Sequence, residues 1–167
     1  MSKKSNVKVI QSPDGQEPQF RMIDVGAKRV TRRRAVACGT IVTGAEAFAR
    51  IRDKTLPKGD VLALAEVAGI MGAKKTPDLI PMCHTLPLDQ VGVHCVLRAP
   101  DAVDVYCQVV AHAKTGVEME AIAGVQAALA TIWDLTKGTN PALLISDVKL
   151  LVKEGGKSGL WLNPDGV

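Results

Sequence analysis

One stretch, Gly116 to Gly138, most constrains how this chain can fold. Its sequence, GVEMEAIAGVQAALATIWDLTKG, places apolar side chains at three- and four-residue steps, with alanine at many of the other positions. This spacing predicts one long helix that buries most of its circumference. A capping box formed by Thr115 and Glu118 predicts its start, and a left-handed Gly138 followed by Pro141 predicts its end. The remaining segments must pack around this helix.

The charged residues of the predicted helix stand near its two ends, and they are candidate functional groups. Charges on an otherwise buried helix require water, a partner or a ligand. Taken alone, Asp134 and Lys137 have the spacing of a modest surface ion pair. Glu120 and Asp134 lie about four turns apart, roughly 21 Å along the axis. If both serve one site, either the ligand is long or a neighbouring subunit supplies one end.

At 167 residues, the chain is most simply one domain. We expect residues 1–19 to form a mobile arm, 20–160 a single catalytic domain and 161–167 a short C-terminal tail. The four cysteines form no C-x-x-C pair, and we find no secretory signal or apolar run that could span a bilayer. These features predict a cytoplasmic protein with no membrane partner.

Segments that favour helices and strands follow one another in mixed order, which predicts an α+β fold with helices on one face of an antiparallel sheet. A capping box at Thr43 and Glu46 predicts a helix through about Arg52, and Asp60 is the expected N-cap of another helix. The expected strands cover Phe20–Val25, Arg29–Val42, Val91–Leu97, Val103–Ala111 and Leu144–Val152. In the hairpin, Val96, Tyr106 and Val110 add apolar surface to the second face, which predicts contact with another copy of the chain.

The segment Lys74–Leu88 is irregular because three prolines interrupt it, yet it is apolar enough to pack down as a rigid loop. It presents Cys83 and His84, of which His84 is a candidate pocket residue. An adjacent Cys and His without a second ligand pair do not form a metal site, so we expect none. His94 and His112 alternate with core positions and are expected to be structural or interface residues.

The basic tract Lys28–Arg34 and the net charge of +4 favour an anionic partner. The tract is either a solvated strand face or a binding surface, and a non-catalytic phosphate- or nucleic-acid-binding module is the alternative function. Because aromatic residues make up only 3% of the chain, a small phosphorylated ligand is favoured over nucleic acid.

Two further lysine-containing motifs bear on phosphate and proton chemistry. The GGKSG sequence, Gly155–Gly159, is similar to a phosphate-binding loop, but Leu151 occupies the position of the first glycine and too few residues follow for the required helix. A nucleoside-triphosphatase is therefore excluded. Lys58 stands at the N-terminal end of the helix that Asp60 opens, where the helix dipole opposes an ammonium, so a reactive lysine is expected there.

Several blocks together resemble the family of cyclic pyranopterin monophosphate synthases, the C protein of molybdenum-cofactor biosynthesis. They run from MIDVGAK through KGDVLALAEVAGIMGAKKTPDLIPMCH and KTGVEMEAIAG to WDLTK and VKLLVKEGGKSG. The resemblance implies a ferredoxin-like α+β subunit, assembled as a hexamer of three dimers with active sites between subunits. The chain departs from the family's usual residues at Gly26, at Thr85 and in WDLTKG.

The reaction implied by the resemblance converts 3′,8-cyclo-7,8-dihydroguanosine 5′-triphosphate to cyclic pyranopterin monophosphate and releases pyrophosphate, without a cofactor. Lys58, Asp134 and Lys137 match the family's catalytic residues, as suits the proton transfers of ring opening and closing. The matches to substrate-binding positions comprise Met82, Cys83, His84, Met119 and Glu120, together with Arg33, Lys74 and Lys153 around the triphosphate.

Overall fold

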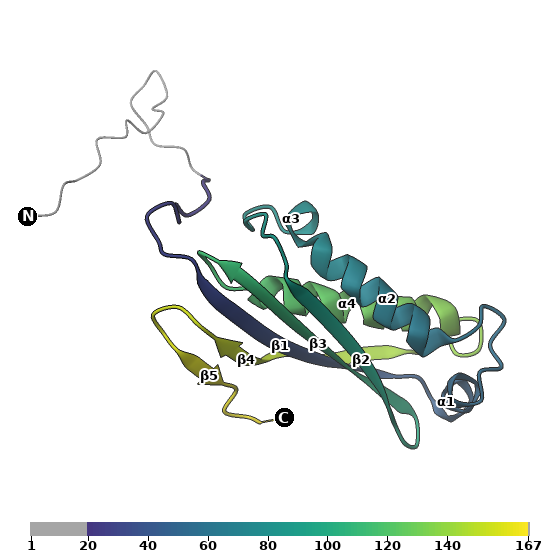
Figure 1. Ribbon diagram of the computed structural model, residues 1–167. Helices are drawn as coiled ribbons and strands as arrows, with labels where there is room; N and C mark the ends of the chain where they lie inside the picture. Colours follow the sequence, from purple (N-terminus) through teal and green to yellow (C-terminus); the bar gives the residue numbers. More distant parts are fainter. Residues whose placement is uncertain (1–19, 167) are drawn as a thin grey trace, which may run out of the picture.

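The computed structural model describes residues 20–166 and shows one antiparallel sheet with helices on one face (Figure 1). The strands follow the spatial order β2-β3-β1-β4-β5, and every neighbouring pair is antiparallel. This arrangement confirms the predicted α+β, ferredoxin-like class. The strands are β1 (Thr31–Val42), β2 (Gln90–Arg98), β3 (Ala102–Ala113), β4 (Leu144–Glu154) and β5 (Leu160–Leu162), and the helices are α1 (Ala45–Arg52), α2 (Val61–Lys74), α3 (Thr76–Leu79) and α4 (Glu118–Thr136).

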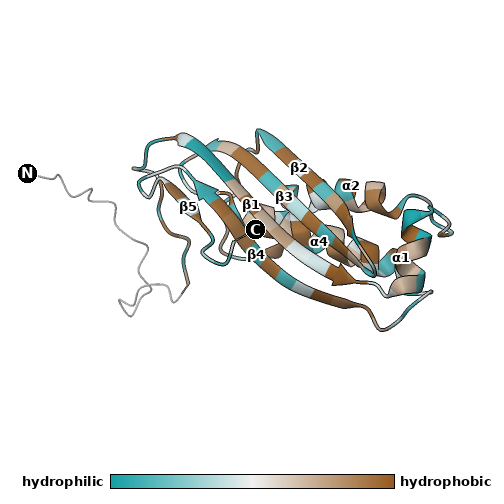
Figure 2. Cartoon of the chain, turned by 90° about the horizontal axis from the view of Figure 1, so that it is seen from below, coloured by the Kyte–Doolittle hydropathy of each residue, from teal (hydrophilic) through white to brown (hydrophobic). Residues whose placement is uncertain are grey.

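The core lies between α4 and the central strands β1 and β3. Alternate residues of β1, including Ala35, Ala37 and Ile41, are fully buried, as expected for a strand with one face against helices. At Gly39, an added Cβ would overlap the side chains of Leu129 and Val125. Glycine at this position lets α4 lie directly on β1. Figure 2 shows the opposite face of the sheet, where hydrophobic and hydrophilic residues both appear along the strands.

Helix α2 packs on the side of α4, and glycines on both helices allow a close approach. An added Cβ at Gly72 would overlap Ala127, and one at Gly69 would lie 2.9 Å from the Gly124 carbonyl oxygen. The N-terminal end of α2 lies beside the C-terminal end of α4 (Figure 1). This pairing places the loop before α2 at the end of α4.

Four local predictions are wrong. Residues 20–25 form no strand and are not part of the sheet; the Ile23 carbonyl accepts a hydrogen bond from His84 instead. Neither capping box forms, because tertiary partners engage the side chains. Thr43 Oγ1 donates to the Asp101 carbonyl at 2.9 Å, and Glu118 pairs with Lys153. Gly138 has no left-handed φ, and α4 ends at Thr136.

Other local predictions are confirmed. Asp60 is the N-cap of α2, and its carboxylate accepts from the Ala63 amide at 3.2 Å. The predicted hairpin is β2–β3, and the strand predicted over Leu144–Val152 is β4, although it is not the last strand because β5 follows it. On the second sheet face, Val110 is buried within the chain, whereas Val96 remains exposed.

Of the two expected terminal segments, the structure describes only the C-terminal one, up to residue 166. The expected arm, residues 1–19, lies outside the described part of the chain. The expected tail begins within β5, which pairs with β4. Within residues 20–166, no helix combines the length and apolar character needed to cross a bilayer.

Candidate active site

Lys58, Asp134 and Lys137 form a cluster at the C-terminal end of α4, and we call it the lysine–aspartate cluster. Asp134 Oδ1 accepts from Lys137 Nζ at 2.6 Å, and Asp134 Oδ2 accepts from Lys58 Nζ at 3.1 Å. Asp134 and Lys137 share one helical face, and the Asp60 N-cap fixes where the preceding loop presents Lys58. The sequence spacing alone predicts that Asp134 and Lys137 lie together, and the fold brings Lys58 to them.

The surroundings of Asp134 favour its charged form. Hydrogen bonds from Lys137 and then from Lys58 hold the pKa of the Asp134 carboxyl below its ordinary value. All three side chains are more than half exposed to solvent. The cluster therefore offers a carboxylate that holds two ammonium groups at an open surface of this chain.

A cavity of about 420 Å³ lies near the other end of α4, and we call it the His84 cavity. It lies between residues 21–28, the loop that carries His84 and the first turn of α4. His84 Nε2 donates to the Ile23 carbonyl oxygen at 2.9 Å, so the loop and the N-terminal segment are joined across it. Its lining includes the predicted substrate-binding residues Met82, Cys83, His84, Met119 and Glu120.

Glu120 is the least exposed charged residue of the His84 cavity. Only 4% of its surface is accessible, and burial raises the pKa of its carboxyl above the ordinary value of 4.5. The neighbouring Cys83 thiol also has a raised pKa, first because of burial and then because of Glu120. This end of α4 therefore offers a carboxyl group that keeps its proton to higher pH than an exposed glutamate.

A second cavity of about 790 Å³ adjoins the first, and we call it the Arg33 cavity. Both cavities share Lys28, Thr115, Gly116 and Glu118 as wall residues. Six cationic side chains face a single carboxylate, Glu118, in its lining: Lys28, Arg29, Arg33, Lys114, Lys153 and Lys157. Such a donor set suits an anionic ligand with several oxygens.

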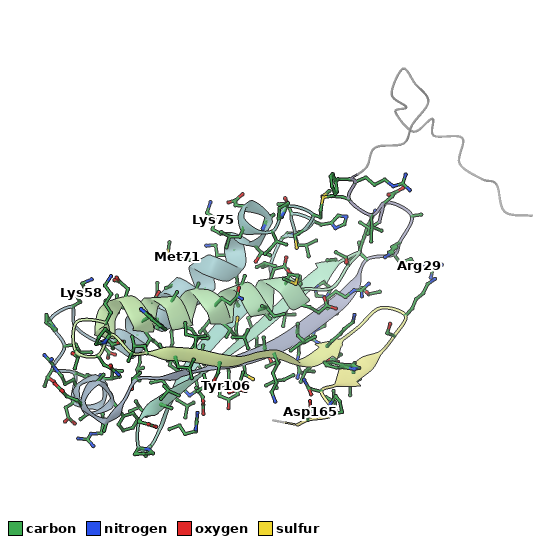
Figure 3. All side chains as sticks on the ribbon, turned by 180° about the vertical axis from the view of Figure 1, so that it is seen from behind. Arg29, Lys58, Met71, Lys75, Tyr106 and Asp165 are labelled. Atoms are coloured by element: carbon green, nitrogen blue, oxygen red, sulfur yellow. The ribbon has the colours of Figure 1, made fainter. Side chains whose placement is uncertain are left out.

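The structure groups most, but not all, of the predicted site residues. Arg33 and Lys153 line the Arg33 cavity, beside the His84 cavity. Lys74, at the C-terminal end of α2, lines neither cavity. Lys58 and Arg29 project at opposite ends of the molecule in Figure 3, so the lysine–aspartate cluster is remote from both cavities in one chain.

Sequence reasoning missed several residues of the Arg33 cavity. Lys114 donates from Nζ to the Gly26 carbonyl at 2.7 Å and thereby fixes the segment before β1. Glu118 pairs with Lys153 at 2.8 Å instead of capping α4. Lys157 belongs to the GGKSG segment, whose spacing does not match a triphosphatase motif, and it lines the cavity. The available signal was the position of Lys114 and Lys157 inside the family-like blocks.

The basic tract Lys28–Arg34 does not form a continuous cationic face. Strand alternation sends Arg32 and Arg34 to the side of Glu154, at 3.9 and 3.4 Å, whereas Arg33 lines the cavity. The basic tract on which the nucleic-acid-binding alternative rests is therefore divided between two sides of the strand.

The remaining histidines and cysteines lie apart from the lysine–aspartate cluster. His94 Nδ1 lies 3.4 Å from Glu66 Oε1, and His112 Nδ1 lies 2.7 Å from Asp89 Oδ2, both at exposed positions. All four cysteines are free thiols. Within residues 20–166, no three His, Cys, Asp or Glu side chains converge as metal ligands.

Comparison with known proteins gives consistent matches. The model of the MoaC family matches residues 22–156. The chain is 45% identical over 146 residues to the cyclic pyranopterin monophosphate synthase of Heliobacterium modesticaldum, covering 87% of this chain and 92% of that protein. It is 47% identical over 145 residues to the protein of the same name from Chloroflexus aurantiacus, covering 86% of this chain and 89% of that protein. It is 46% identical over 146 residues to the Pelobacter propionicus protein of that name, covering 87% of this chain and 91% of that protein.

Proposed function

The chain belongs to the MoaC family, and we propose that the lysine–aspartate cluster and the two cavities together carry out the family's reaction. It is a lyase of molybdenum-cofactor biosynthesis that converts 3′,8-cyclo-7,8-dihydroguanosine 5′-triphosphate to cyclic pyranopterin monophosphate and pyrophosphate. The observation that supports the assignment of residues is that Lys58, 76 positions before Asp134, joins Asp134 and Lys137 through a hydrogen bond to the Asp134 carboxylate.

The lysine–aspartate cluster moves protons. Opening the purine-derived ring and closing the pterin ring require proton transfer to and from nitrogen and oxygen atoms of the substrate. Because Asp134 remains a carboxylate, it is a weak base, and its role is to position the two ammonium groups. Lys58 and Lys137 then serve as proton donors, and either one becomes a base after it has donated its proton.

The His84 cavity binds the base-derived end of the substrate. Its loop, its methionines and the start of α4 supply imidazole, thioether and carboxyl groups around one space of about 420 Å³. Glu120, with its raised pKa, presents a hydrogen-bond donor to the ring edge when protonated and an acceptor when ionised. Arg33 and Lys153 hold phosphate oxygens in the adjoining cavity.

The active site is shared between two copies of the chain. Asp134 and Glu120 are separated along α4 by roughly 21 Å, too far for both to act on one compact reaction centre. A neighbouring subunit therefore brings its lysine–aspartate cluster to the cavities. In support, α2 exposes an apolar stripe at Leu64, Val67 and Met71, exposed to 44%, 56% and 60%, of which Figure 3 labels Met71. The assembly that the family resemblance implies is a homo-oligomer, a hexamer of three dimers.

The proposed setting is the cytoplasm. The substrate is a small nucleotide-derived molecule, and the free thiols of this chain suit a reducing compartment.

A single-turnover assay with the purified protein and the cyclised dihydro-GTP tests this function. Pyrophosphate and the pterin product are followed together. Lys58→Ala and Asp134→Asn are each expected to slow product formation by about 10²- to 10⁴-fold, the usual contribution of acid–base groups. The matched control is Asp78→Asn, because Asp78 and Lys75 form an ordinary exposed pair at the same spacing, 3.2 Å apart. A Lys58→Ala protein with the wild-type rate would show that the assignment of this lysine is wrong.

A further inference from the structure

Lys54, just after helix α1, has a backbone conformation that lysine rarely adopts. Its φ is +54°, in the left-handed region, where a Cβ lies close to the following carbonyl oxygen. The Lys54 amide donates to the Ile51 carbonyl at 3.2 Å, and the Thr55 amide donates to the Arg50 carbonyl at 3.0 Å. These two bonds form a helix end at which glycine is the usual left-handed residue. A strained lysine at this position indicates that its side chain has a role beyond the turn.

The Lys54 side chain spans the loop between α1 and α2. Its Nζ lies 2.7 Å from Asp60 Oδ2, while Asp60 Oδ1 accepts from the Ala63 amide at 3.2 Å as the N-cap of α2. The hydrogen bond from Lys54 is the main reason that the pKa of the Asp60 carboxyl lies below its ordinary value. One carboxylate therefore ties the end of α1 to the start of α2.

Lys58 lies inside the loop that this ion pair closes. Leu56, which is only 5% exposed, anchors the middle of the loop in the core. The Gly59 amide donates to the Leu56 carbonyl at 3.1 Å, and Gly59 has a φ of +92° that its lack of a side chain permits. The backbone is thus held on both sides of Lys58, whose Nζ donates to Asp134 Oδ2 at 3.1 Å.

The Lys54–Asp60 pair also affects which carboxylate Lys58 meets. Asp60 is the acidic residue closest to Lys58 in sequence, two positions away, and Lys54 occupies it. The other acidic residue of the loop, Asp53, is paired with Arg52 at 2.8 Å. Without Lys54, the Asp60 carboxylate would compete with Asp134 for the Lys58 ammonium.

We propose that Lys54 is a positioning residue, which holds Lys58 against Asp134 by closing the 54–60 loop and by occupying Asp60. The catalytic consequence of this inference rests on the proposed function, in which Lys58 donates a proton. Lys54 lines neither the His84 cavity nor the Arg33 cavity. Its loss is therefore expected to lower kcat and to leave KM unchanged.

Turnover of the cyclised dihydro-GTP by Lys54 variants tests this role. Lys54→Gln is expected to lower kcat by about two- to fivefold, because the Lys54 and Asp60 side chains are 66% and 36% exposed and a surface ion pair has a modest effect. Lys54→Arg keeps a cation that can pair with Asp60, so it should recover most of kcat. A kcat of Lys54→Gln equal to that of the wild type overturns the proposal, as does a loss in Lys54→Arg as large as in Lys54→Gln.

Lys54→Gly separates positioning from stability. Glycine removes the ion pair, as glutamine does, but it relieves the left-handed strain. Lys54→Gly should therefore unfold at a higher denaturant concentration than Lys54→Gln and yet have the same lowered kcat. If kcat instead follows the unfolding midpoint across these two variants, Lys54 has only a structural role and the proposal is wrong.

Lys75→Gln is the matched control, because Lys75 and Asp78 form another exposed lysine–aspartate pair, 3.2 Å apart, at the other end of α2. The substitution removes the same charge and one surface ion pair. It should keep the wild-type kcat. A loss equal to that of Lys54→Gln would overturn the proposal, since a general effect of charge would then explain both results.

Cross-linking of the full chain with a carbodiimide, which joins amines to carboxylates in contact, follows the position of Lys58 without turnover. In the wild type, Asp134 should join to both Lys58 and Lys137, as measured by mass spectrometry of the linked peptides. In Lys54→Gln, the Lys58–Asp134 product should fall about two- to fivefold, a Lys58–Asp60 product should appear, and the Lys137–Asp134 product should stay constant.

The two measurements distinguish failure of this inference from failure of the proposed function. If the wild type forms pterin while kcat and the Lys58–Asp134 product are unchanged in Lys54→Gln, only the role of Lys54 is wrong. If the cross-links change as expected but the wild type forms no pterin, the proposed function is wrong and the placement of Lys58 by Lys54 stands.

Discussion

Asp134 and Glu120 are carboxylic acids of the same helix in opposite surroundings. Two ammonium groups lower the pKa of Asp134, and burial raises the pKa of Glu120. Differences of this kind between two acids of one site commonly separate their roles. In the proposed reaction, Asp134 holds the proton donors in place, and Glu120 contacts the substrate ring with or without its proton.

The raised pKa of Glu120 predicts how the Glu120→Gln substitution affects stability. Between the ordinary pKa of 4.5 and the raised value, the folded chain binds more protons at this group than the unfolded chain. The free energy of unfolding contributed by Glu120 therefore falls as the pH rises through this range. Glutamine has no charge to bury, so Glu120→Gln should remove this decline while it impairs substrate binding.

Denaturant unfolding from pH 4 to pH 8 measures the effect. Glu46→Gln, in the exposed first turn of α1, is the control and should keep the wild-type pH profile. If the free energy of unfolding of the Glu120→Gln protein changed with pH in the same way as that of the wild type, burial would not disfavour the ionised form of Glu120.

The residues that the sequence could assign are those with a local or block-like signal. Asp134 and Lys137 stand three apart on one helix, and this spacing alone brought them together. Lys58 joined them only through the family resemblance, because no local rule pairs it with a residue 76 positions away. The spacing of the GGKSG motif does not reveal that Lys157 lines the Arg33 cavity, because the turn lies against Arg33, which is on another strand.

At the level of elements, glycine determines how closely α2 approaches α4. Gly69 and Gly72 on α2 face Gly124 and Ala127 on α4, and these small residues leave room for backbone contact. The contact also fixes the position of the lysine–aspartate cluster, because Lys58 precedes α2 and Asp134 stands on α4. Packing of the two helices is thus a condition for the geometry of the cluster.

Gly72→Ala should destabilise the protein by about 1–3 kcal/mol, the usual cost of overpacking a core. The added methyl group would overlap Ala127 and lie 3.1 Å from the Ala123 carbonyl oxygen. Chemical denaturation measures the change in the free energy of unfolding. Alanine favours a helix by about 1 kcal/mol over glycine, so a gain in stability would show that the two helices can separate at little cost.

Gly92→Ala is the control for this substitution. Gly92 lies on the edge strand β2, where an added Cβ would meet nothing within 4 Å. Its stability should change by less than about 0.5 kcal/mol. If Gly92→Ala lost as much stability as Gly72→Ala, the loss would be a general effect of replacing glycine and would not report contact between the two helices.

Sequence patterns predicted elements better than their ends. The hairpin, the long helix and the last strand follow from periodic apolar residues, which report burial directly. The two capping boxes failed because Thr43 and Glu118 found partners distant in sequence, Asp101 and Lys153. Residues 20–25 have a strand-like composition, but no strand pairs with them, and His84 donates a hydrogen bond to the Ile23 carbonyl beside the His84 cavity.

At the scale of the whole molecule, one chain keeps apart the groups that the proposed reaction needs together. The lysine–aspartate cluster is at the C-terminal end of α4, and the His84 and Arg33 cavities are near its N-terminal end. The rigidity of a continuous helix prevents these groups from meeting by local motion. An oligomer in which each active site takes the cluster from one subunit and the cavities from another resolves the separation.

Coexpression of two inactive variants with different tags tests this shared site. Lys58→Ala lacks the cluster, and His84→Ala lacks a cavity residue. If sites are shared and the chains mix at random, about one site in four is intact, so the mixed oligomers should regain about a quarter of wild-type activity. The control pairs Lys58→Ala with Asp134→Asn, which damage the same cluster in either chain and should regain none.

The measurement that tests the account most directly is therefore pterin formation by these two mixtures, compared with each variant alone. Recovery in the Lys58→Ala and His84→Ala mixture, with none in the Lys58→Ala and Asp134→Asn mixture, is the predicted result. Inactivity of both mixtures, with mixed oligomers recovered through both tags, would contradict a site shared between subunits.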